Sequence, residues 1–324
     1  MTGMRRALGF LLNRAERLTE GRHLTGAAIF RIVAGANTLL VFLLNYHDRG
    51  YLFGPDGIVE FSDFTQNIRG FSLYSWSESV LWFELVFHAG ILAAMLWMLG
   101  VWPLLLTPVT YVLWYSLYER NTLIWDGGDN IMAIMFVYAM FMRLDAGPSL
   151  TDGIWARAPE VARRLRNLFH NLAVLCAALQ LSIVYAVSGL SKVQGETWQN
   201  GTALYYVLQS AEFSLPGVSD ILFYNGALLA FVCYVTVFFL IGFPALVFLN
   251  RRTRVLAVIM GITFHLGIGV LMGLVSFALF MIAAELLLIS DAEYRWIGTR
   301  AKALASWTVQ LFTRTPVVAR NAGH

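Results

Sequence analysis

The sequence predicts an all-α, polytopic membrane helical bundle of about eight transmembrane helices, with both termini in the cytoplasm. Of its 324 residues, 58% are hydrophobic and only 13% are charged, whereas soluble domains are about 25% charged. Apolar stretches close to the roughly 20 residues that cross a bilayer recur along the chain. In addition, Lys and Arg gather in alternate connections between these stretches, as they do in membrane proteins of fixed orientation.

Eight apolar stretches are separated by polar or Gly- and Pro-containing connections, which favour turns. Only Gly273 could form a turn between the last two stretches, which are therefore either two spans or one broken helix with a re-entrant piece. The expected spans are residues 24–46, 78–99, 104–118, 130–142, 168–190, 220–249, 255–272 and 274–289.

The positive charges predict the orientation and the domain organisation. Eighteen of the 23 Lys and Arg residues fall in the N-terminal segment, two alternate connections and the C-terminal tail, which places these segments in the cytoplasm. We therefore expect a cytoplasmic basic leader (1–22), a transmembrane domain (23–290) and a cytoplasmic tail (291–324). The tail has apolar residues at helical spacing, so it is either an amphipathic helix on the membrane or a short cytoplasmic helix without function.

Several function classes find no support in the sequence. Cys176 and Cys233 lie in apolar stretches and form no CxxC, so neither a disulfide framework nor thiol redox chemistry is expected. The net charge of +3 gives no sign of nucleic-acid binding. No Walker loop, GxSxG or dinucleotide motif is present. No pair of histidines has metal-ligand spacing, so no metal is expected.

Ionisable side chains inside apolar spans need a partner or a function. Arg31 lies in the first span, where it either pairs with a carboxylate or binds backbone carbonyls, and His265 lies deep in the seventh. The polar segment 119–130 contains Asn121, Asp126 and Asp129 next to two glycines. Asp129 suits a helix N-cap, and an equally weighted alternative directs its carboxylate into a site at the outer face.

Lys192 ends the fifth span and is the only lysine before the tail. A desolvated lysine can lose its proton and act as a base or nucleophile, which arginine cannot do. The alternative is an interfacial lysine whose charged end reaches water. Trp198 follows six residues later in the same polar loop. The predicted orientation places this loop on the extracytoplasmic side.

Three stretches resemble the HTTM (horizontally transferred transmembrane) family, the membrane domain of vitamin K-dependent gamma-carboxylase and of many bacterial proteins, including sporulation-delaying toxin maturation-type proteins. The first is Phe30-Arg31-Ile32 followed by residues 52–57. The second, residues 119–129, is similar to the pattern HxRNxxxxxGGD, and the third runs over residues 184–201. Phe264-His265 resembles a late Phe-His pair of the carboxylase. The resemblance covers about residues 20 to 290.

The resemblance implies a base role for Lys192, because a lysine at this position of the carboxylase deprotonates vitamin K hydroquinone. It thus implies a quinone as cofactor and carboxylase-like chemistry, of the carbon–carbon lyase or ligase or quinone epoxidase type. The chain departs from the carboxylase in having Ser191-Lys192 in place of two lysines, and in having Asp129 near the position of a functional histidine. The fold therefore carries over better than the reaction.

Three functions follow as hypotheses for this multi-pass protein of the cell membrane. The first is an enzyme acting on a quinone or peptide at the outer face, with Lys192, Asp129 and His265 as catalytic residues. The second is a non-enzymatic maturation or export partner for a secreted peptide or toxin, acting with a small membrane protein. The third is a small-molecule transporter. The expected substrate-binding residues are Arg31, Asn121, Asp126 and Trp198.

Overall fold

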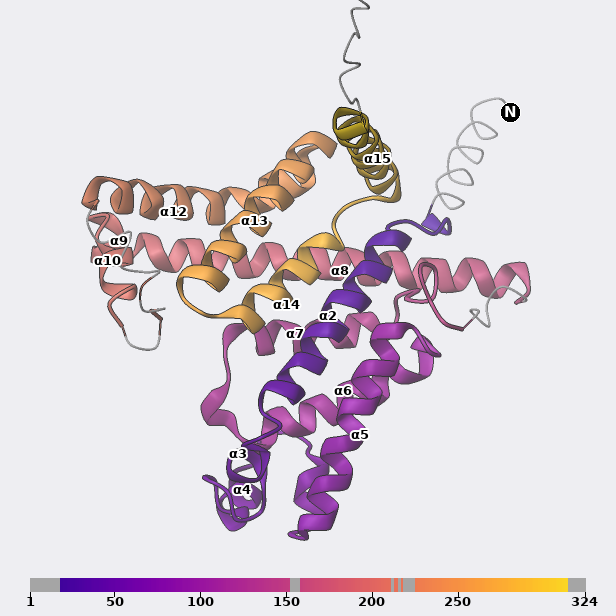
Figure 1. Cartoon of the computed structure of the whole chain (residues 1–324), viewed down its shortest axis with the longest axis vertical. Coiled ribbons are helices and arrows are strands. Elements are labelled where there is room, and N and C mark those ends of the chain that lie inside the picture. Colours follow the sequence, from indigo (N-terminus) through magenta and orange to yellow (C-terminus); the bar gives the residue numbers. More distant parts are fainter. Residues whose placement is uncertain (1–17, 152–157, 211–212, 215–216, 218–224, 314–324) are drawn as a thin grey trace, which may run out of the picture.

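The computed structural model describes residues 18–151, 158–210, 213–214, 217 and 225–313. These residues form helices joined by turns and loops and contain no strand, which confirms the all-α fold class. The basic leader lies almost wholly outside the described residues, as does the end of the tail. Figure 1 shows the helices gathered around one long helix, residues 160–193. Two short helices, within residues 49–67, lie at the bottom of the view, and the C-terminal helix, residues 291–313, lies at the top.

Eight helices of the described chain correspond to the eight expected spans. They are α2 (Leu24–Leu44), α5 (Val80–Leu99), α6 (Pro103–Arg120), α7 (Gly127–Ala139), α8 (Glu160–Val193), α12 (Gly226–Leu249), α13 (Arg251–Leu271) and α14 (Val275–Leu286). Shorter helices occupy the loops: α3 (Arg49–Phe53), α4 (Phe61–Asn67), η1 (Leu73–Trp76), η2 (Thr122–Ile124), α9 (Glu196–Gln199) and α10 (Ala203–Val207). The last helix is α15 (Asp291–Thr313).

Five of the described helices, α2, α5, α8, α12 and α13, are long and apolar enough to cross a membrane. A sixth candidate is α14 together with α15, although the two are bent by 108°. Helix α7 has 13 residues and is therefore only about 20 Å long. A count of eight full spans and the cytoplasmic position of the termini thus stay predictions.

One expected boundary differs markedly in the structure, and one expected turn is present. The fifth span was expected from residue 168, but α8 begins at Glu160 and has 34 residues. Its first two turns are the Arg-rich segment, where Glu160 and Arg164 form an exposed i,i+4 ion pair, and such pairs support a solvated helix. Between α13 and α14, Gly273 adopts a φ of 71°, so the chain does turn at this glycine.

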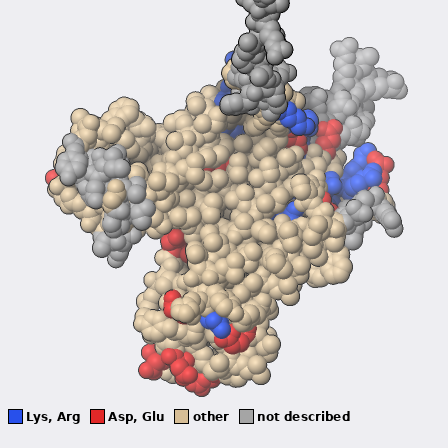
Figure 2. All heavy atoms as spheres, viewed as in Figure 1, with Lys and Arg blue, Asp and Glu red and all other residues tan. Residues whose placement is uncertain are grey.

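Close helix packing builds the bundle. Helix α12 packs along α8, and α2 packs against both α5 and α14. Glycines allow the closest approaches: a Cβ at Gly35 would lie 2.9 Å from the Cα of Met98, and one at Gly189 would lie 2.7 Å from Ile241. Small residues at such contacts are typical of membrane helices. In Figure 2 most charged residues of the visible face lie near its margins, and the surface between them is largely uncharged.

Candidate functional site

Lys192 lies in the last turn of α8, on the same face as Tyr185 and Ser188. These residues stand at positions i, i+3 and i+7, a spacing that aligns side chains along a helix. The Lys192 side chain is half-buried, and its Nζ lies 5.1 Å from the centroid of the Trp198 ring. Among the described residues, no carboxylate forms an ion pair with Lys192. The neighbour of its amine is therefore an aromatic face rather than a counter-ion.

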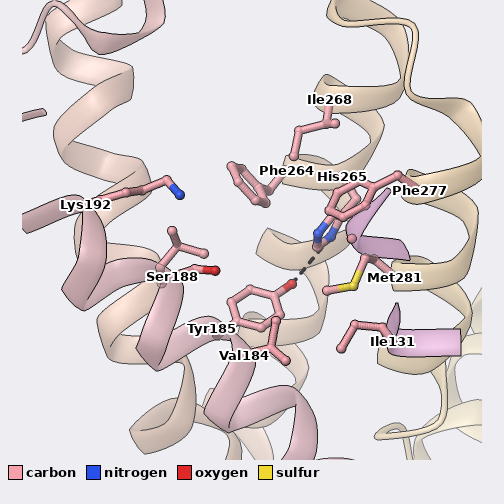
Figure 3. Close-up of a pocket in the computed structure, with 12 residues that line it drawn as sticks. Ile131, Val184, Tyr185, Ser188, Lys192, Phe264, His265, Ile268, Phe277 and Met281 are labelled. Atoms are coloured by element: carbon pink, nitrogen blue, oxygen red, sulfur yellow. Dashed lines mark hydrogen bonds between the residues drawn. The ribbon is translucent and has the colours of Figure 1, made fainter. Parts of the chain in front are cut away.

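A pocket of about 230 Å³ opens between α8, α13, α14 and the start of α7. In Figure 3, Lys192 and Ser188 point from α8 toward Phe264 and His265 on α13. The remaining walls are mostly apolar or aromatic side chains, namely Ile131, Val184, Leu240, Ile268, Phe277 and Met281. The pocket is therefore an apolar space bordered by a few polar groups that face one another, as is usual for small-molecule sites.

A trio of polar side chains from three helices lies beside this pocket, and two of them, Tyr185 and His265, line it. His265 Nδ1 lies 2.8 Å from Glu285 Oε1 and 3.4 Å from the Tyr185 hydroxyl. The Tyr185 hydroxyl also donates a hydrogen bond to Glu285 Oε1. Glu285 is fully buried, and its Oε2 has no hydrogen-bond partner among the residues that the structure describes. Such an arrangement is costly unless the groups pair.

Gly261 makes room for this trio. A Cβ at this position would lie 2.6 Å from Glu285 Oε1, so only glycine lets the carboxylate reach α13. The carbonyl of Gly261 also lies 3.0 Å from His265 Nδ1. A contact with a carbonyl and one with a carboxylate both favour a proton on Nδ1. The other ring nitrogen, Nε2, forms no hydrogen bond within the described chain.

A larger cavity of about 620 Å³ adjoins the first and lies between the end of α8, α10, α12 and α13. Lys192, Phe264 and Ile268 line both spaces. The larger cavity is lined almost entirely by apolar side chains, with Trp198, Thr236 and Thr263 as its other polar contributors. Lys192 thus stands where an apolar cavity meets a small pocket that leads to buried acid–base groups.

Arg31, on α2, lines neither of these cavities. Its guanidinium donates hydrogen bonds to the carbonyls of Trp97 (2.9 Å), Met98 (2.6 Å), Leu144 (3.1 Å) and Pro148. It thus joins the end of α5 to the segment before α8. These contacts correspond to the carbonyl-binding alternative considered for Arg31.

The polar segment before α7 forms helix caps. The Asp126 carboxylate accepts hydrogen bonds from the backbone amides of Gly128 (2.6 Å) and Asp129 (3.2 Å), and Asp129 Oδ2 accepts one from the Asp126 amide. Burial raises the pKa of Asp126, although the two amide bonds act in the opposite direction. Asn121 donates to the carbonyl of Leu52 (2.9 Å). None of the three side chains lines either cavity, but Gly127 does.

The structure therefore places Lys192 in one pocket with His265 and in the larger cavity with Trp198, whereas the other predicted site residues line neither space. Sequence reasoning did not single out Tyr185 and Glu285. Glu285 could have been found, because it is an ionisable residue inside the eighth apolar stretch, the criterion that drew attention to Arg31 and His265. Tyr185 had no such signal, since tyrosines are common in membrane helices.

Comparison with known proteins gives two relatives, both from Bacillus subtilis strain 168. Sporulation-delaying protein SdpB is 27% identical over 274 residues, which cover 82% of this chain and 81% of SdpB. The chain is similar to SdpB along most of its length. The uncharacterized protein YitO is 23% identical over 272 residues, or 81% of this chain and 84% of YitO. No family model matches, and no solved structure does.

The SdpB similarity supports the predicted relation to sporulation-delaying proteins. Together with the apolar helices, it supports a multi-pass membrane protein. Membership of the wider HTTM family stays a prediction.

Proposed function

We propose that this protein is a membrane enzyme that takes a lipid-soluble substrate into the cavity beside Lys192 and uses the Lys192 amine as a base. The observation that carries the proposal is the position of Lys192. It borders both the apolar cavity and the smaller pocket, and no carboxylate within the described chain neutralises it. A substrate dissolved in the bilayer could enter such a cavity without crossing water.

A lysine suits this role better than the arginine that the chain uses almost everywhere else. A neutral amine accepts a proton, whereas a guanidinium stays charged and cannot act as a base. Ser188 lies one helical turn before Lys192 and lines the same pocket. Its hydroxyl is available to hold a substrate oxygen or a water molecule near the amine.

The residues present fit a quinone, the cofactor that the HTTM resemblance implies. Phe264 and Phe277 provide aromatic walls for a ring in the small pocket, and the larger cavity offers apolar space for a chain. When bound, a hydroquinone would supply an acidic ring hydroxyl. Lys192 would orient that hydroxyl and hold its proton, and Trp198 would shield the amine from water.

The similarity to SdpB favours a second candidate function, maturation of a secreted peptide. In that case the apolar cavity would hold part of the peptide or of a small membrane partner. The two functions are compatible, because a peptide-modifying enzyme needs both an acid–base group and a binding surface. They differ in what should remain bound to the purified protein.

Filling the cavity tests the proposal. Gly267 lines the larger cavity, and a Cβ there would meet no atom within 4 Å, so Gly267→Phe places a ring in the cavity without a backbone clash. Gly242→Phe on α12 is the matched control, since Gly242 is equally unobstructed and lines neither cavity. Each protein is purified in native lipid nanodiscs, and the extracted lipids are analysed by mass spectrometry.

We expect a quinone to co-purify with the wild type, and several times less of it to co-purify with Gly267→Phe. The Gly242→Phe control should match the wild type. A secreted peptide in place of a quinone would favour the second function. Equal quinone levels in all three proteins, or none in the wild type, would contradict quinone binding in this cavity.

A further inference from the structure

We propose that Glu285 and Tyr185 hold His265 as an imidazolium, whose Nε2–H stabilises negative charge on a substrate oxygen in the pocket that Lys192 shares. This inference rests on the proposed function, and it adds an anion-stabilising group to the base. The group that the imidazolium would bind is an oxygen of a lipid-soluble substrate. This oxygen becomes negatively charged when the substrate loses a proton.

The close contact between Glu285 and His265 supports the charged state of the pair. Glu285 is fully buried and His265 is 2% exposed, so a single unpaired charge on either would be costly. A carboxylate and an imidazolium at 2.8 Å are neutral as a pair. The Tyr185 hydroxyl donates to the same oxygen, so Glu285 Oε1 serves as an acceptor for both of its neighbours.

The contacts of the imidazole ring determine which nitrogen serves the pocket. Nδ1 is held by Glu285 and the Gly261 carbonyl, so its proton stays within the trio. Nε2 has no partner in the described chain, while the His265 ring lines the pocket. In an imidazolium both nitrogens carry protons. The Nε2–H is therefore the donor left to face a substrate, and a preorganised donor of this kind stabilises developing charge strongly.

The proton balance of the step is simple. The substrate O–H bond breaks, its proton forms an N–H bond on the neutral Lys192 amine, and the electron pair stays on the substrate. No oxidant or reductant takes part. The resulting anion occupies a largely apolar pocket that the Lys192 ammonium and the His265 imidazolium both line, and electrostatic interactions are strong in such surroundings. Glu285 offsets the second positive charge.

An ionisable chromophore that binds in the pocket tests the inference directly. The probe is 4-nitrophenol carrying an octyl chain, whose phenolate absorbs visible light, bound to the intact protein in nanodiscs at one fixed pH. We compare the wild type with Glu285→Gln, which keeps the shape of the side chain and removes its charge. Glu84→Gln is the matched control, because Glu84 pairs with Arg49 outside both cavities. The methyl ether of the probe, which cannot ionise, reports binding alone.

We expect the wild type and Glu84→Gln to bind the probe as phenolate. Glu285→Gln should lower the ratio of phenolate to phenol at least about tenfold while binding the methyl ether normally. An unchanged ratio in Glu285→Gln, or neutral phenol bound to the wild type, would overturn the inference. If Glu285→Gln does not fold, Tyr185→Phe should shift the ratio severalfold in the same direction, and no shift would overturn it. Failure of the wild type to bind either probe would instead contradict the proposed cavity function.

Discussion

At the scale of single residues, buried ionisable groups in this protein are accommodated in different ways. Arg31 is surrounded by backbone carbonyls, and Glu285 is paired with His265 and Tyr185. Lys192 has an aromatic neighbour but no counter-ion among the described side chains. Because burying a charge without a counter-ion is costly, the lysine is the group whose position calls for a functional explanation.

Arg31 gives a prediction about stability. Arg31→Met keeps much of the side-chain volume but leaves the carbonyls of Met98, Leu144 and Pro148 without this donor, while Trp97 keeps the Gly100 amide as a donor. We expect it to lower the free energy of unfolding by about 3 kcal/mol or more, because unsatisfied buried polar groups cost about 1–3 kcal/mol each.

The measurement is thermal or denaturant unfolding in detergent. Arg164→Met is the control, because Arg164 forms an exposed ion pair with Glu160 that is worth less than about 1 kcal/mol. Equal stability losses in the two variants would contradict the structural role of Arg31.

The sequence allowed part of the site to be predicted. Lys192 and His265 stood out because each is polar in an apolar span, and the structure places both on one pocket. Asp126 and Asp129 stood out because they belong to a polar turn with two glycines, yet they bond to each other's backbone at the start of α7. Local sequence cannot tell whether a carboxylate caps its own helix or faces a cavity formed by helices from distant parts of the chain.

At the scale of elements, apolar length and turn residues predicted the helices well, whereas contacts between distant segments could not be predicted. The start of α2 is an example. Its N-cap residue, His23, makes no side-chain capping bond. Instead, the Asp291 carboxylate accepts hydrogen bonds from the amides of Thr25 (2.7 Å) and Leu24 (3.3 Å). No local pattern reveals a cap supplied from more than 260 residues away.

This remote cap predicts a pH dependence of stability. Burial raises the pKa of Asp291, but the hydrogen bonds from Thr25 and Leu24 outweigh it, so the pKa lies below its ordinary value of 3.8. A carboxyl group whose pKa is lowered on folding stabilises the fold fully above its ordinary pKa. This contribution is lost as the pH falls through the lower pKa of the folded state.

We therefore expect Asp291→Asn to lower the free energy of unfolding by about 1 kcal/mol at neutral pH. The difference from the wild type should shrink below about pH 4. Unfolding in detergent at several pH values measures it, with the exposed Asp63→Asn as control. A difference that stays constant down to low pH would show that the Asp291 charge is not the cause.

At the scale of the whole molecule, charge distribution and cavity position support one another. The largely uncharged surface of the face shown in Figure 2 is suited to contact with lipid. Lys192 lies at the end of α8 far from the Arg-rich start of that helix, and the predicted orientation places it at the outer face. A lipid-soluble molecule would thus reach the amine from within the membrane.

The most direct test of this claim is the chemical reactivity of the two lysines of the chain, Lys192 and Lys302. Protein in nanodiscs is treated with phenyl isothiocyanate, which dissolves in lipid, or with its sulfonated, water-soluble form, and the modified peptides are quantified by mass spectrometry. Lys302 lies exposed on α15 and serves as the internal reference. We expect the lipid-soluble reagent to modify Lys192 in the wild type and in Gly242→Phe, but several times less in Gly267→Phe. Equal modification of Lys192 in all three proteins, or preferential modification by the water-soluble reagent, would contradict a substrate cavity at Lys192.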